Sequence, residues 1–134
     1  MVQEIVDLQS TVTTEQIARF NTKFIPESRL SDQEFLKWRF RTTNSEGAKI
    51  STHYGILAGD EIAAMISTQP MRAWINDKWQ PCNYWGDWFV DPNHKGAGLS
   101  LLNHVIYHTS SLLACSGSKQ AYSIYRRKPP FAVL

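Results

Sequence analysis

The sequence predicts an α/β (α+β) fold in which helices flank one mixed sheet. Two observations carry this prediction. The 134 residues are 43% hydrophobic and include five Trp, five Tyr and six Phe, which is enough apolar surface for one packed core. Along the chain, the spacing of apolar residues changes from a helical period to a period of two and back again. We therefore expect one domain over residues 1–134, with its elements in the order β-α-α-β-β-β-α-β.

The first third of the chain is expected to give a strand and two helices. Residues 2–8 alternate weakly between apolar and polar side chains, which is typical of a strand. Residues 13–16 and 31–34 each have the pattern of a capping box, a hydroxyl side chain followed three residues later by Gln or Glu, so each predicts the start of a helix. The first helix is expected to end at Pro26. The expected apolar faces are Ile17, Phe20 and Phe24 in the first helix, and Phe35, Trp38 and Phe40 in the second.

The middle of the chain has the pattern of antiparallel strands joined by tight turns. Five segments are predicted as strands: 53–58, 62–68, 71–75, 78–81 and 83–90. The dipeptides Gly59-Asp60 and Asn76-Asp77 predict two-residue hairpin turns, the first after 53–58 and the second after 71–75. The aromatic-rich segment 83–90 is expected to lie at the centre of the sheet and to stop at Asp91-Pro92.

A late helix and one further strand complete the predicted order. From Gly98 onward, apolar residues recur at three- and four-residue steps, which predicts a helix that Ser116-Gly117-Ser118 closes. Its apolar positions are Leu99, Leu102, Val105, Ile106, Leu112 and Leu113. His104 and His108 are expected to be partly exposed on this helix. Residues 120–126 are predicted to form the last, short strand.

Charge is divided unevenly between the two parts of the chain. Residues 1–91 hold nine basic and all 12 acidic residues, a net charge of −3, whereas residues 92–134 hold five basic residues and no acidic one, a net charge of +5. The C-terminal third should therefore favour an anion, either nucleic acid, a phosphorylated cofactor or an acidic protein. Nucleic acid is the weaker choice, because the Lys and Arg residues are few and are not interleaved with exposed aromatic residues, so we expect no nucleic-acid partner.

Composition also argues against a membrane or metal protein. No apolar run approaches the roughly 20 residues of a transmembrane helix, and the acidic N-terminus lacks the layout of a signal peptide. We expect a cytoplasmic protein with no membrane partner. Cys82, Cys115 and the four His residues fit no metal-ligand spacing, so we expect no metal and two buried, reduced thiols.

The most informative stretch is residues 88–102, where a strand leads through a loop and a turn of small residues into a helix. Within Lys95–Ser100, the glycines allow backbone N–H groups to approach a ligand closely, and the first turn of the helix adds unpaired donors at the positive end of its dipole. This arrangement is typical of a phosphate-binding loop. The spacing of Gly96 and Gly98 excludes the Rossmann fingerprint, and the Walker pattern lacks its ending.

Val90-Asp91-Pro92 followed by Lys95–Ser100 resembles the central motif of the GNAT superfamily of N-acyltransferases. That motif has Arg or Gln, two residues, Gly, one residue, then Gly or Ala, after a strand ending in Val-x-Pro. Here Lys95 replaces the Arg or Gln, and Ser100 replaces the last Gly or Ala. The resemblance implies a GNAT-like fold and the transfer of an acyl group, most simply acetyl from acetyl-coenzyme A, to a small-molecule or peptide amine by direct attack.

The resemblance further implies which residues bind the acyl-coenzyme A. The loop amides would bind its pyrophosphate, and backbone groups of the preceding strand would bind its pantetheine arm. The implied cofactor-binding residues are Trp88, Phe89, Val90, Lys95, Gly96, Ala97, Gly98, Leu99 and Ser100.

The same strand offers two candidate catalytic side chains, Tyr84 and Asp87. Strict alternation puts Tyr84 on one face with Gly86, Trp88 and Val90, and puts Asp87 on the opposite face unless the strand bulges. The resemblance places the pantetheine arm on the face of Tyr84, so Tyr84 is expected to matter more than Asp87. Because its reference pKa is near 10, Tyr84 is a poor base and would act by orienting a water.

The family continues past its fifth strand with another helix and two strands, and the prediction of a strand at 120–126 leaves them out. The tyrosine that this helix often supplies as general acid is then missing. We therefore expect the domain to be incomplete at its C-terminus, or to dimerise through the exposed edge of its last strand. A second function stays open, a non-catalytic coenzyme-A-binding or interaction module. The tryptophans at 74, 79, 85 and 88 are expected mostly to pack, with one or two lining an acceptor pocket.

Overall fold

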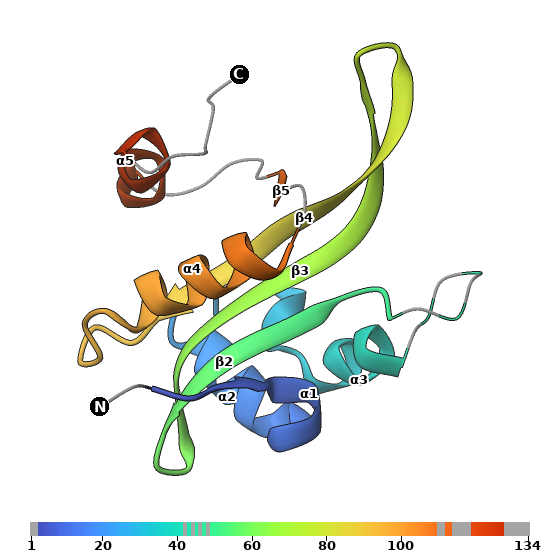
Figure 1. Ribbon diagram of the computed structural model, residues 1–134. Helices are drawn as coiled ribbons and strands as arrows, with labels where there is room; N and C mark the ends of the chain where they lie inside the picture. Colours follow the sequence, from blue (N-terminus) through green and yellow to red (C-terminus); the bar gives the residue numbers. More distant parts are fainter. Residues whose placement is uncertain are drawn as a thin grey trace.

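The computed structural model describes residues 3–41, 43, 45, 47, 49–109, 112–113 and 119–127. Its elements are β1 (Ile5–Asp7), α1 (Leu8–Thr11), α2 (Thr14–Thr22), the 3₁₀ helix η1 (Arg29–Ser31), α3 (Gln33–Arg41), β2 (Thr52–Ala58), β3 (Glu61–Ile75), β4 (Lys78–Val90), α4 (Ala97–His108), β5 (Leu112–Leu113) and α5 (Lys119–Arg127). The strands form one sheet in the order β1-β2-β3-β4-β5, in which β5 alone is parallel to its neighbour. Figure 1 shows this sheet with its flanking helices, which confirms the predicted fold class.

Two tight hairpins join the three long strands at the predicted positions. Gly59, between β2 and β3, has a φ of 64°, while Asn76 and Asp77, between β3 and β4, have φ values of 51° and 58°. In the Asn76-Asp77 turn both central residues have positive φ, which is the conformation of a type I′ turn and matches the twist of the strands beside it. β3 and β4 each run on where the sequence predicted two short strands, and their hairpin projects beyond the body of the domain (Figure 1). β3 is the middle strand of the sheet, so the prediction that 83–90 lies at its centre is wrong.

The first predicted capping box is confirmed. The Thr13 hydroxyl accepts a hydrogen bond from the Gln16 amide, and the Gln16 side chain accepts one from the Thr13 amide. The two side chains thus satisfy N–H groups that have no acceptor within the helix. Helix α2 ends at Thr22, before Pro26.

The second capping box is corrected by one residue. Asp32, not Ser31, accepts the hydrogen bond from the Phe35 amide, at 2.9 Å, whereas the Ser31 hydroxyl donates to the carbonyl of Ile25 at 2.8 Å. Leu36 is the fully buried residue of α3, while Trp38 is 58% exposed. The predicted apolar face of this helix therefore holds only for Phe40, which packs against the core.

The C-terminal third departs most from the prediction. Helix α4 ends at His108, and Leu112 and Leu113 form β5 rather than a further helical turn. Residues 119–127 are helix α5, so the predicted strand at 120–126 is wrong. Ala121 is buried and Ile124 packs against the core, a spacing of three residues that belongs to a helix and not to a strand. A helix thus follows the fifth strand, as the GNAT resemblance implies, and the expected dimer through a last strand at 120–126 loses its basis.

The sheet buries a different cluster on each face. The face that carries α4, called the α4 face, buries Ile56, Ala63, Ala64, Ile66, Trp85, Ala97, Leu101, Leu102 and Val105. The face that carries α1 to α3, called the α3 face, buries Leu8, Ile17, Ala18, Phe20, Leu36, Ile62 and Met65. Figure 1 shows the helices of the two clusters on either side of the strands.

Two expectations from composition also bear on the fold. Cys82 is a buried free thiol, as predicted, and Cys115 lies outside the described residues. Within the described ranges, no helix is both long and apolar enough to span a membrane.

Candidate functional site

β4 contains a bulge at the start of the stretch that the sequence singles out. Met65 of β3 pairs with Phe89 and Ser67 pairs with Gly86, so β4 has one residue more than β3 between these two pairs. Asp87 lies in this bulge with a φ of 49°, a left-handed conformation that Asp tolerates better than most residues. The extra residue reverses the alternation of side chains along β4.

This reversal corrects the predicted faces. Trp85 is buried in the α4-face cluster, and Trp88 and Val90 pack against it. Phe89 packs on the opposite, α3 face and stacks on Phe24, with ring centroids 5.1 Å apart. Trp88 and Val90 therefore do not share a face with Tyr84, whose partner in the pairing, Gln69, is in phase with Met65 of the α3-face cluster.

Asp87 points to the α3 face and is the centre of a polar cluster there. Its Oδ2 atom accepts a hydrogen bond from the Ser67 hydroxyl at 2.8 Å and lies 3.0 Å from Nη1 of Arg39 and 3.7 Å from Nε2 of His53. The side chains of Asp87 and Arg39 are 15% and 14% exposed, and that of His53 is 1% exposed. Each of these contacts is to Oδ2. None of the three involves Oδ1, so Oδ1 is the carboxylate oxygen that we consider for a ligand.

The cluster fixes the charge of its members. Burial, the largest influence, raises the pKa of Asp87, but His53, the Arg39 charge and the Ser67 hydroxyl together outweigh it and hold this pKa below its ordinary value of 3.8. Burial lowers the pKa of His53 below 6.5, although Asp87 acts in the opposite direction. At neutral pH the site therefore contains an ionised carboxylate beside a neutral imidazole and a guanidinium.

The far side of His53 is held by α1. Gln9 donates from its amide nitrogen to the carbonyl of Ser51 at 3.0 Å, and the same nitrogen lies 3.5 Å from Nδ1 of His53. The Phe40 ring packs edge-on against the imidazole, with centroids 4.9 Å apart. A donor at Nδ1 favours the tautomer that carries its proton on Nε2, toward Asp87.

Sequence reasoning named Asp87 but missed its partners. Arg39 is one of several cations of α3 and Ser67 lies within β3, and neither stands in a local pattern that marks a site. His53 did carry a signal, because alternation within a strand that starts at residue 52 turns it toward one face of the sheet. The three come from α3, β2 and β3, and only the tertiary fold brings them together.

Tyr84 is close to this cluster. A Cβ built on Gly86 would lie 3.2 Å from Cε1 and 3.5 Å from the hydroxyl oxygen of Tyr84, so the ring covers Gly86. Both predicted catalytic residues thus occur on the α3 face of β4, on either side of Gly86. The bulge is what brings Asp87 to the face where alternation alone put only Tyr84.

The edge of β4 opposite β3 is only partly occupied. β5 pairs with it at Asn83 and Tyr84. Among the residues that the structure describes, no strand pairs with that edge from 85 to 90. Backbone N–H and C=O groups of an unpaired edge can bind an extended ligand as a further strand would.

The predicted phosphate-binding loop leads directly from this edge into α4. The Asp91 carboxylate accepts a hydrogen bond from the Asn93 amide at 2.9 Å, which closes the turn after β4. Gly96 is the N-cap of α4, with a φ of 89°, and makes no side-chain cap. The amide of Ala97 donates to the carbonyl of His94 at 3.3 Å, whereas those of Gly98 and Leu99 have no acceptor within the helix, and Lys95 is exposed. An anion at this position would meet N–H donors and the positive end of the dipole.

Gly98 has a packing role besides. A Cβ on Gly98 would lie 2.5 Å from Cγ2 of Val90 and 3.3 Å from Nε1 of Trp88. Ala97 and Gly98 are both buried against β4, whereas Leu99 and Ser100 are exposed. The small residues of this turn therefore let α4 approach the strand closely.

The other candidates from the sequence stay outside this site. His104 is half-buried and His108 exposed on α4, as predicted, with their rings stacked at 4.1 Å. Trp74 and Trp79 form an exposed cross-strand pair on the projecting hairpin, 5.6 Å apart. In the described ranges there is no group of His, Cys, Asp or Glu that could hold a metal ion.

Comparison with known proteins identifies the fold. No protein-family model matches the chain, and no curated protein sequence matches it. Solved structures do match. An acetyltransferase from Trypanosoma brucei is 13% identical, with a TM-score of 0.69 over 99% of this chain and 94% of that one.

Two further similar structures are of acetyltransferases whose names include a substrate. Glucosamine-6-phosphate N-acetyltransferase from Arabidopsis thaliana is 14% identical, with a TM-score of 0.66 over 100% of this chain and 96% of that one. An aminoglycoside acetyltransferase from an uncultured soil sample, in complex with sisomicin, is 17% identical, with a TM-score of 0.62 over 99% and 90%. These similarities extend over nearly the whole chain, and this protein has the fold of these acetyltransferases, in agreement with the GNAT-like fold that the sequence resemblance implies.

Proposed function

We propose that this protein is an N-acyltransferase that moves an acetyl group from acetyl-coenzyme A to a primary amine by direct attack. The amine nitrogen forms a bond to the acyl carbon, the carbon–sulfur bond breaks, and the proton that the nitrogen loses is balanced by the proton that the departing thiolate gains. The observation that carries the proposal is the bulge in β4, which turns an ionised carboxylate to the α3 face of this strand in an acetyltransferase fold.

The cosubstrate is assigned to β4 and the loop after it. Backbone groups of Trp88, Phe89 and Val90 would pair with the pantetheine arm, because the β4 edge has no strand beside it at those positions within the described ranges. The first amides of α4 and the turn at Gly96 would bind the pyrophosphate, with Lys95 adding a cation. Ala97 and Gly98 would serve by packing α4 tightly on the strand.

Asp87 is proposed to receive the acceptor. Its carboxylate stays ionised at neutral pH, and Oδ1 has no partner among the contacts of the polar cluster, so an ammonium group can donate to it. A carboxylate with a lowered pKa is a weak base. We therefore assign Asp87 to holding the amine and passing its proton on through water, with Tyr84 as the hydroxyl that orients this water.

The general acid is assigned to helix α5. Its presence after β5 restores the element that the sequence analysis left out. The family resemblance implies that this helix supplies a tyrosine as general acid, and its sequence has tyrosines at positions 122 and 125. A phenol is a suitable donor to a departing thiolate because its reference pKa is near 10. One of the two is proposed for this role, and replacing each in turn by Phe tells which, with the other variant as the matched control.

The acceptor is proposed to be an amine on a small polar molecule of the cytoplasm. Two of the similar structures are named for amines of this class, an aminoglycoside and a hexosamine phosphate. A buried carboxylate suits such an acceptor because it discriminates an ammonium from a neutral hydroxyl.

Release of the coenzyme A thiol tests the proposal. The full chain is incubated with acetyl-coenzyme A and a panel of amino sugars, aminoglycosides, polyamines and peptides, and thiol release is followed with each. We expect release that depends on one class of amine and on Asp87. Tight binding of acetyl-coenzyme A by calorimetry with no release for any amine would favour the second candidate, a coenzyme-A-binding module without catalysis.

A further inference from the structure

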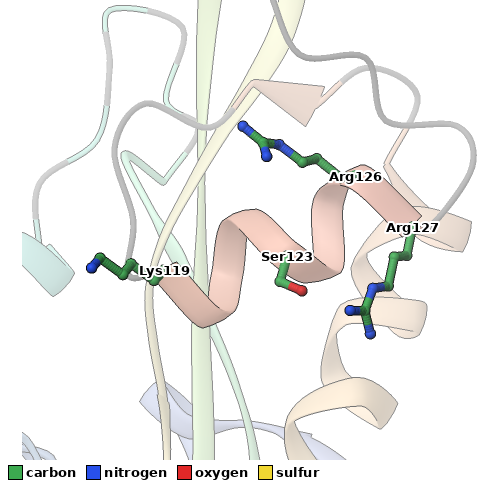
Figure 2. Close-up of a pocket in the computed structure, with 4 residues that line it drawn as sticks. All are labelled: Lys119, Ser123, Arg126 and Arg127. Carbon is green, nitrogen blue, oxygen red and sulfur yellow. The ribbon is translucent and has the colours of Figure 1, made fainter.

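Helix α5 lines a cavity that the acyl-transfer proposal does not use. The described residues that line it are Lys119, Ser123, Arg126 and Arg127, and its volume is about 480 Å³. Figure 2 shows the four side chains leaving this one helix, with Ser123 between Lys119 at one end and the two arginines at the other. A cavity of this size takes a small molecule or one group of a larger one.

The spacing of these residues is that of a helix face. Lys119, Ser123 and Arg127 are four residues apart and lie above one another, and Arg126 is next to this row. The opposite side of α5 carries Ala121, which is buried, and Ile124, which packs against the α4-face cluster. The helix therefore turns its apolar side to the core, and its three cations line the cavity, with Arg126 and Arg127 leaving the helix on opposite sides in Figure 2.

These cations have no counter-ion in the part of the chain that the structure describes. Each acidic residue of the protein precedes residue 92. The ion pairs found among the described residues involve cations of the first half of the chain and His53, and none involves α5. A concave surface of one sign of charge raises the local concentration of ligands of the opposite sign.

The position of Lys119 separates a ligand site from ordinary helix stabilisation. Arg126 and Arg127 are in the last turn of α5, where cations are favoured by the helix dipole. Lys119 is in the first turn, where a cation is disfavoured, and that turn has no acidic residue to offset it. An anion in the cavity would be attracted by Lys119 and by the positive end of the helix together.

We propose that this face of α5 binds a phosphate monoester. Such a group carries close to two negative charges at neutral pH, which matches three cations better than a carboxylate does. Arginine can donate two parallel hydrogen bonds to phosphate oxygens, lysine adds a point charge, and the Ser123 hydroxyl donates one more bond. The phosphate belongs either to the ribose of coenzyme A or to a phosphorylated acceptor amine, and only this choice of source rests on the proposed function.

Matched pairs of ligands test the site. Calorimetry at low salt compares coenzyme A with dephospho-coenzyme A, glucosamine-6-phosphate with glucosamine, and inorganic phosphate with chloride. We expect one phosphorylated member to bind at least about 10-fold more tightly than its partner, a preference that Lys119→Gln and Arg126→Gln each reduce by about the same factor. Lys78→Gln, which removes an exposed cation from the distant hairpin, is the control and should change nothing.

Ser123→Glu provides a second test that does not depend on loss of structure. A carboxylate at the centre of the row would pair with Lys119 and Arg127 four residues away on either side. We expect this variant to melt at a higher temperature than the wild type and to lose the preference for the phosphorylated ligand. If the variant no longer prefers coenzyme A over dephospho-coenzyme A, the site binds the cosubstrate. If it no longer prefers glucosamine-6-phosphate over glucosamine, the site binds the acceptor.

The inference is overturned if the wild type binds both members of every pair equally, or if Ser123→Glu leaves the preference intact. Failure of the proposed function gives a different pattern. In that case no amine releases the thiol, while binding of the phosphate group and its loss in Ser123→Glu are unchanged.

Discussion

The two faces of β4 use the same strand for opposite purposes. On the α4 face, Trp85, Trp88 and Val90 meet an apolar helix, and a glycine at position 98 lets the two backbones approach. On the α3 face, the same strand places Asp87 among Ser67, His53 and Arg39. Apolar packing tolerates volume-conserving exchanges, whereas a buried charged cluster depends on each partner.

The difference between the faces arises at one residue. Without the bulge, Asp87 would point into the apolar α4-face cluster, where a carboxylate has no partner. With it, Trp85 and Trp88 both reach the apolar side, although they are three positions apart and strict alternation would put them on opposite faces. An inserted residue in a strand can therefore place a charged group on one face while the core on the other face stays apolar.

The largest expected effect is on the charged face. Under the proposed role of Asp87, Asp87→Asn should lower turnover by about 10²- to 10⁴-fold, because the acceptor amine loses its carboxylate. It should also lower the free energy of unfolding by about 3–5 kcal/mol, because Arg39 is left buried without its partner. Urea unfolding and thiol release measure the two effects.

The double variant Arg39→Met with Asp87→Asn separates these effects. Removing both charges should restore most of the stability and none of the turnover. Glu61→Gln, which removes an exposed carboxylate, serves as the control. Recovery of turnover in the double variant would show that Asp87 acts only on stability, and that the charged face is structural like the other.

A smaller effect is expected on the apolar face. Gly98→Ala should lower the free energy of unfolding by about 1–3 kcal/mol, because its Cβ would press on Val90. Adding Val90→Ala should relieve the contact and recover part of the loss. Gly96→Ala is the matched comparison, since its site has open space and costs only the left-handed backbone, about 1 kcal/mol. Equal cost for the two glycine variants, with no rescue, would contradict the close helix–strand contact.

The smallest effect is a pH dependence to which both faces contribute in the same direction, because burial lowers the pKa of His53 on the charged face and, with the charge of His108, that of His104 on α4. The pKa of His53 is lowered on folding, so below about pH 6.5 the unfolded chain binds a proton that the native imidazole does not. Stability should be complete above that pH and decline below it, by at most about 1.4 kcal/mol per pH unit. Asp87, whose pKa is also lowered, adds its loss only below its ordinary value of 3.8.

Melting temperatures between pH 8 and pH 5 measure this slope. His53→Asn should be less stable at pH 8 and flatter between pH 6.5 and pH 5 than the wild type. A slope that this substitution leaves unchanged would assign the acid sensitivity to His104 instead.

Local signals in the sequence predicted the parts of the fold that local interactions determine. The capping box at Thr13 and the turns at Gly59 and Asn76-Asp77 are set by residues within a few positions of each other. The loop after β4 was placed correctly for the same reason. The ligand-binding roles of its residues stay predictions.

Non-local features were mispredicted or missed. Residues 120–126 include Ile124 and two tyrosines, residue types that favour strands, but burial of Ala121 and contact of Ile124 with the core select the helix. The bulge had only a weak signal, an acidic residue after Gly86 in an aromatic strand. Its position depends on the pairing with β3, which no short pattern contains.

The long β3–β4 hairpin has a consequence for the order of folding. Its type I′ turn joins strands whose paired residues are close in sequence, so closing it costs little chain entropy, and hairpins of this kind form in about 1–10 μs. The pairing of β1 with β2, which joins Ile5 to Ile56, must close a much longer loop. Arg39, His53 and Asp87 meet only when α3 has docked on the finished sheet. The spectroscopic signal of β-strands should therefore appear early in refolding. The proposed acyl-transfer activity should return as the last observable step.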